Sequence, residues 1–62
     1  MSLKNRIEFR LSELELLLKT GKYQEAETLI PNITKFISIL TEEQVDLVNA
    51  AKYAVSENIP WK

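Results

Sequence analysis

Residues 14–30 read LELLLKTGKYQEAETLI, and this stretch decides the fold. It contains the only glycine of the chain, Gly21, between two segments without glycine or proline. Glycine adopts the left-handed backbone conformation at little steric cost, and this conformation commonly follows the last turn of an α-helix. We therefore predict that a first helix ends at about Lys19 and that a second begins at Lys22 or Tyr23.

Apolar residues recur before this glycine at the spacing of an amphipathic helix. At 100° per residue they form one stripe about 80° wide, which is the face that a helix buries. Ser2 precedes the stripe and can cap the first turn. The pattern predicts a helix over residues 3–19. The residues of the stripe are Leu3, Ile7, Leu11, Leu14 and Leu18.

The segment after the glycine also carries helical periodicity, but Pro31 interrupts it. Proline lacks a backbone donor and clashes with the preceding turn of a helix. We predict helical structure over about residues 22–40, either as one helix kinked at residue 31 or as two short helices that share a face. The apolar residues on that face are Ala26, Leu29 and Ile30 before the proline and Ile33, Phe36, Ile37 and Leu40 after it.

The strongest helix start in the chain is the sequence TEEQ at residues 41–44. It has the form of a capping box, in which the Thr41 hydroxyl accepts from the amide of Gln44 and the Gln44 side chain returns to the amide of Thr41. Two glutamates in the first turn also suit the helix dipole. We predict a third helix over about residues 42–57, closed by Asn58 and followed by a tail that extends to residue 62.

Together these segments predict an all-α, single-domain fold over residues 1–62, in which the first two helices form a hairpin and the third packs across it. A chain of 7.2 kDa buries roughly 6,000 Å² on folding, which contributes about 90 kcal/mol if about 60% of that area is apolar. Ordering the chain costs nearly the same. There is no cysteine for a disulfide, so the usual additional source of stability is oligomerisation, and we predict a homodimer.

The residue types needed for common catalytic chemistry are missing from the sequence. It has no histidine and no cysteine, which removes the commonest general base, the thiolate nucleophile and the usual zinc ligands. A single glycine cannot form a phosphate-binding loop. Glu8, Glu15, Glu42 and Glu43 could converge between subunits, but a solvated charged face is the favoured interpretation. The sequence predicts no enzyme, no metal site and no cofactor.

Two apolar residues lie on the opposite side of the first predicted helix from its leucine stripe. Phe9 and Leu16 fall at about 200° and 180° from Ile7 on the helical wheel. A helix that is apolar on two opposite sides is usually packed between two layers. We therefore predict that Phe9 and Leu16 contact a partner, with the third helix of the same chain as the alternative.

The third predicted helix has an apolar face about 220° wide, which exceeds what a helix in a monomeric bundle needs. Leu47, Ala50 and Ala54 extend this face, and the two alanines, four residues apart, would let a second helix approach closely. Alternatively, they are alanines on a solvated surface, where alanine is a good helix former. Trp61 either anchors a partner, as tryptophan often does at interfaces, or folds back over the bundle. Folding back is favoured.

The first helix begins with three basic residues, Lys4, Arg6 and Arg10, and Glu8 is the only acid before Glu13. Positive charge at a helix N-terminus opposes the helix dipole, which suggests contact with an anion such as a phosphate. Pairing of Lys4 with Glu8 and of Arg10 with Glu13 within the helix is the favoured alternative.

Residues 16–26, LLLKTGKYQEA, resemble the hairpin turn of a tetratricopeptide repeat, in which a Gly-x-Tyr-x-x-Ala pattern joins two antiparallel helices. Gly21, Tyr23 and Ala26 occupy those positions. The resemblance implies a helical hairpin at Gly21 and a protein-binding role, and no family resemblance extends over the whole chain.

Charge and hydropathy bound the remaining possibilities. The net charge is −1, with both signs dispersed, so no global field attracts nucleic acid or an anionic membrane. No secretory hydrophobic region follows Met1, and no apolar run approaches the ~20 residues that span a bilayer, so we expect a cytoplasmic protein. The leading prediction is a non-enzymatic protein-interaction or accessory module, a homodimer that binds a larger protein. The alternative is a small nucleic-acid-binding accessory protein that uses the basic start of the first helix.

Overall fold

The computed structural model describes residues 2–61, which form three α-helices and one short 3-10 helix. The α-helices are α1 (Leu3–Lys19), α2 (Tyr23–Thr34) and α3 (Glu42–Glu57), and the 3-10 helix η1 (Ile37–Ile39) lies between α2 and α3. No strand occurs among the described residues. The predicted all-α fold of three helices is confirmed, as are the limits of α1 and α3.

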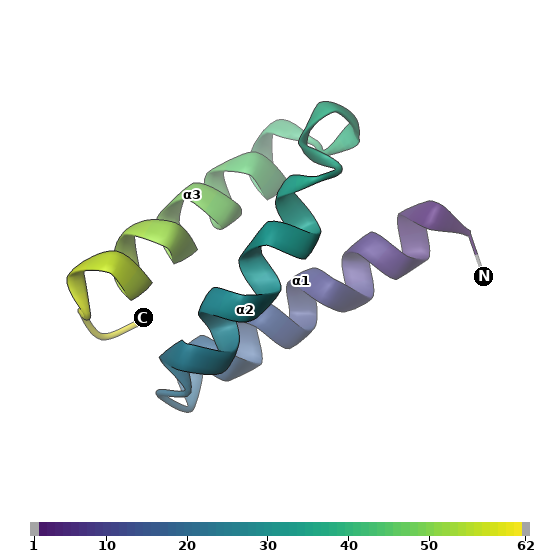
Figure 1. Cartoon of the computed structure of the whole chain (residues 1–62). Helices are drawn as coiled ribbons and strands as arrows, with labels where there is room; N and C mark the ends of the chain where they lie inside the picture. Colours follow the sequence, from purple (N-terminus) through teal and green to yellow (C-terminus); the bar gives the residue numbers. More distant parts are fainter. Residues whose placement is uncertain (1, 62) are drawn as a thin grey trace.

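The helices are arranged around α2, which contacts both α1 and α3 more extensively than these two contact each other. Figure 1 shows α2 returning from the turn after α1, crossing α1, and then connecting through η1 to α3. The molecule measures 31 × 20 × 18 Å along its principal axes. The first two helices therefore form the predicted hairpin, and α3 packs on its α2 side.

The turn between α1 and α2 has the hydrogen bonds of a Schellman motif. Gly21 has a φ of +76°, as predicted for the residue that follows a helix cap. Its amide donates to the carbonyl of Leu18 at 3.2 Å, and the amide of Lys22 donates to the carbonyl of Leu17 at 2.8 Å. These two bonds occupy carbonyls that the end of a helix would otherwise leave without a partner.

Both predicted N-terminal caps are present. Ser2 accepts a hydrogen bond from the amide of Asn5 at 3.2 Å. At α3, the Thr41 hydroxyl accepts from the amide of Gln44 at 3.2 Å, and the amide of Thr41 donates to the Gln44 side chain at 2.9 Å, which completes the capping box. Asn58 closes α3 in the left-handed conformation with a φ of +54°.

A single kinked helix over residues 22–40 is wrong, because α2 ends at Thr34. The segment instead contains two helices, α2 and η1, which are separated after Thr34 and not at Pro31. Pro31 lies inside α2, so one backbone donor is missing just before the end of the helix. The Thr34 hydroxyl donates to the carbonyl of Ile30 at 2.9 Å, and η1 contains two further β-branched isoleucines, which disfavour continued helix. Ile37 is consequently 41% exposed, although the periodicity predicted that it faces inward.

The core lies where the three helices meet, and it is entirely apolar among the described residues. Four large side chains are almost completely inaccessible to solvent: Leu14, Leu18, Ile33 and Val48. Leu3, the first residue of the predicted stripe, remains 45% exposed. The other buried residues are Ile7, Leu11, Ala26, Leu29, Ile30, Ala51 and Ala54.

Loss of the α3 cap should measurably destabilise the fold. We expect Thr41→Ala to lower the free energy of unfolding by about 1 kcal/mol, because the amide of Gln44 loses its acceptor. For a domain of this size the melting temperature should fall by several degrees, as followed by circular dichroism. Thr28→Ala, in the interior of α2, is the matched control and should not lower the melting temperature. If the Thr41 variant and the wild type had the same melting temperature, the result would contradict the capping box.

A side chain at the hairpin turn should destabilise the fold through backbone conformation alone. A Cβ atom added to Gly21 would have no neighbour within 4 Å, so no steric contact adds to the effect. We expect Gly21→Ala to cost about 1–2 kcal/mol in urea unfolding, because alanine disfavours the left-handed conformation. Gly21→Asn should cost less, since asparagine tolerates that conformation better. If both variants were as stable as the wild type, the left-handed turn would be disproved.

Candidate interaction sites

The outer side of α1 presents two large apolar side chains to solvent. Phe9 is 64% exposed and Leu16 is 60% exposed. They lie opposite the buried stripe of α1, as the helical wheel predicted. The alternative that the third helix of the same chain covers them is wrong, because both side chains remain exposed in the folded chain. We call Phe9 and Leu16 the α1 outer patch.

The accessible apolar surface that was predicted on α3 from Leu47, Ala50 and Ala54 is not present. Ala50 is exposed, but Ala54 is only 3% exposed and is covered by the same chain. The two alanines therefore do not form one accessible strip for a second helix. Leu47 is half-buried and packs against the core. The wide apolar face of α3 is largely used within the monomer, because α3 contacts both α2 and α1 and buries Val48, Ala51 and Ala54.

The tail after α3 folds back onto the bundle, which is the favoured of the two predicted alternatives. Trp61 is partly buried and packs against the core. The Tyr23 hydroxyl, from the first turn of α2, donates a hydrogen bond to the carbonyl of Ile59. The predicted tail also included Lys62, which lies outside the described residues.

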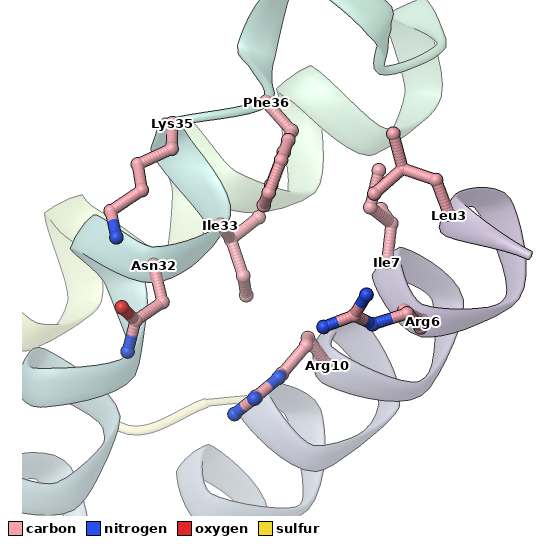
Figure 2. Close-up of a pocket in the computed structure, with 8 residues that line it drawn as sticks. All are labelled: Leu3, Arg6, Ile7, Arg10, Asn32, Ile33, Lys35 and Phe36. Carbon is pink, nitrogen blue, oxygen red and sulfur yellow. The ribbon is translucent and has the colours of Figure 1, made fainter. Parts of the chain in front are cut away.

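Two of the three basic residues at the start of α1 line one cavity. Arg6 and Arg10 line a cavity of about 220 Å³ between α1 and the C-terminal end of α2, whereas Lys4 is not among its lining residues. Figure 2 shows the side chains of Arg6 and Arg10 extending from α1 toward α2, where Asn32 and Lys35 lie. We call this space the α1–α2 cavity.

The α1–α2 cavity combines this basic rim with an apolar interior. Ile7 and Ile33 are 6% and 1% exposed, so they form its base, while Leu3 and Phe36 stand beside them and are more accessible. Among the described residues that line the cavity, none is acidic. The cavity therefore suits a group that carries negative charge next to an apolar portion.

Sequence reasoning identified Arg6 and Arg10 but missed their neighbours on α2. In an antiparallel hairpin, residues equally distant from the turn lie opposite each other. Arg10 precedes Gly21 by as many residues as Asn32 follows it, and the same relation holds for Arg6 and Phe36. The mirror relation about Gly21 would have placed Lys35 near the arginines once the hairpin was accepted.

Two more open depressions lie on other parts of the bundle. One continues the seam between α1 and α2 toward the turn, and its lining includes Glu13 and Glu25 but no basic residue among the described ones. The other lies between α2 and α3, beside Pro31 and Lys52. The seam between α1 and α2 thus changes from basic at the N-terminal end of α1 to acidic toward the turn.

No group of three or more potential metal ligands occurs within residues 2–61. Within the same range, no helix combines the length and hydrophobicity required to cross a lipid bilayer.

No protein-family model matches the chain, and comparison with curated proteins and with solved structures finds no significant match. No relative therefore supplies a function by similarity.

The contacts of the tail can be tested through Trp61. We expect Trp61→Ala to lower the free energy of unfolding by about 1 kcal/mol, because the indole covers part of the apolar core. Tyr53→Ala removes an aromatic ring that is 63% exposed on α3 and should have a smaller effect. Thermal unfolding of the two variants, followed by circular dichroism, makes the comparison. If both variants had the same melting temperature as the wild type, the indole would not pack on the bundle in solution.

Proposed function

We propose that this protein is a non-enzymatic interaction module that forms a homodimer through the α1 outer patch and binds a larger protein partner. The observation that carries the proposal is the exposure of Phe9 and Leu16 on a helix whose opposite face is already buried. They are seven positions apart in the sequence, which places them two helical turns apart on one side of α1.

The accessible surface of the chain supports association. It measures 4561 Å², compared with about 4,100 Å² for a typical folded monomer of this mass. The balance between hydrophobic burial and chain entropy also leaves little stability for the isolated chain. Burying two large side chains in a dimer would add about 1.5–3 kcal/mol for each side chain that is fully covered.

Nucleic-acid binding is the less supported function. It was predicted from Lys4, Arg6 and Arg10, but only the two arginines line the cavity. The same seam becomes acidic at Glu13 and Glu25, so a phosphate backbone that followed it would meet repulsion. The net charge of −1 supplies no compensating attraction.

Substitution of the α1 outer patch should change the oligomeric state. We expect the wild type to sediment as a dimer at micromolar concentration, and Phe9→Asp or Leu16→Asp to shift the mass toward the monomer. A buried carboxylate without a partner is strongly disfavoured, so the charged variants cannot maintain an apolar contact. Sedimentation equilibrium measures the mass directly, and circular dichroism verifies that the helices remain.

Tyr53→Asp is the matched control, because Tyr53 is as exposed as Phe9 but lies on α3. It should leave the dimer intact. A well-folded wild-type monomer at every concentration would refute self-association, and equal effects of all three variants would show that the α1 outer patch is not the interface.

A further inference from the structure

We propose that the α1–α2 cavity binds an acidic peptide segment of a partner protein, with one bulky apolar side chain in the cavity and flanking carboxylates against Arg6, Arg10 and Lys35. The inference rests on the proposed interaction function and specifies the chemistry of the larger partner. The site is separate from the α1 outer patch, since neither Phe9 nor Leu16 lines the cavity.

The first basis for the inference is that three cations from two helices line the same cavity. Arg6 and Arg10 come from α1, while Lys35 comes from the residue that caps α2. All three are exposed, and Figure 2 shows Arg6 and Arg10 on the α1 side of the cavity and Lys35 on its α2 side. Positive charge on both sides of the cavity, with no acidic residue among the described lining residues, favours an anionic ligand. Arginine also offers paired donors that match a carboxylate.

The second basis is the apolar base of the cavity. Ile7 and Ile33 close it from below, and Phe36 and Leu3 provide partly exposed apolar walls. A volume of about 220 Å³ is below the usual range of pockets that enclose a whole small molecule, about 300–1,000 Å³. The space therefore suits a single side chain presented by a longer chain, such as leucine or phenylalanine.

The chemistry on either side of the cavity favours a peptide over a nucleic acid. A phosphate backbone has no apolar side chain to cover Ile7, Ile33 and Phe36. Farther along the seam, Glu13 and Glu25 would repel a uniformly anionic polymer. A peptide can place its acidic residues beside the arginines and a neutral or basic residue beside these glutamates. It can therefore complement both the basic and the acidic part of the seam between α1 and α2.

Selection from random-sequence peptides displayed on phage tests this inference with the full-length protein as bait. We expect the enriched peptides to share acidic residues next to a large apolar residue. The most enriched peptide, labelled with a fluorophore, is then titrated with the protein by anisotropy. The variant in which Arg6, Arg10 and Lys35 are all changed to Gln should bind at least about tenfold more weakly. Added salt should weaken wild-type binding.

The matched control changes Lys19, Lys22 and Lys52 to Gln, which removes the same charge away from the cavity, and it should retain wild-type affinity. Three results would overturn the inference: no enriched peptide or no acidic preference, equal loss in both charge variants, or binding of labelled duplex DNA that depends on the cavity residues. None of these three results depends on the sedimentation of the Phe9 and Leu16 variants, so the two proposals fail separately.

Discussion

The left-handed backbone at Gly21 is the constraint on which the other placements depend. Its φ of +76° reverses the chain within a few residues and lets the Schellman bonds complete the end of α1. The reversal makes α1 and α2 antiparallel neighbours, so the start of α1 lies beside the end of α2. The core, the exposed outer side of α1 and the α1–α2 cavity are all consequences of that pairing. Glycine is the residue that adopts this conformation at the least cost.

Most of the fold could be predicted because its local signals agree with one another. Ser2, Thr41 with Gln44, and Asn58 each satisfy backbone groups at a helix end, and such bonds involve residues close together in the sequence. The limits of α1 and α3 follow from these residues. The end of α2 has no comparable signal, since apolar periodicity continues past Thr34 while Pro31 and the β-branched residues weaken the helix.

The surfaces were harder to predict, because exposure depends on how far each neighbouring helix reaches. The helical wheel correctly placed Phe9 and Leu16 opposite the buried stripe, since both positions follow from α1 alone. The wheel of α3 could not show that Ala54 is buried while Ala50 is exposed, because α2 and α1 cover only part of its wide apolar face. Prediction of the cavity would have required the relative placement of α1 and α2. A single-helix pattern contains Arg6 and Arg10 but not their proximity to Lys35.

The hydrogen bond from Tyr23 to the carbonyl of Ile59 joins the first turn of α2 to the tail after α3. Together with the contact of Trp61 on the core, it closes a loop that contains α2 and α3 and leaves α1 outside. Detaching α3 requires this closure to open, whereas α1 is joined to the rest only through the turn at Gly21 and its own packing. Packing compensates for this difference, because α1 buries four large residues, Ile7, Leu11, Leu14 and Leu18, whereas α3 buries only Val48, Ala51 and Ala54. The helix that carries both candidate interaction sites is therefore retained by its apolar face, and α3 by a smaller apolar face together with the closure of the tail.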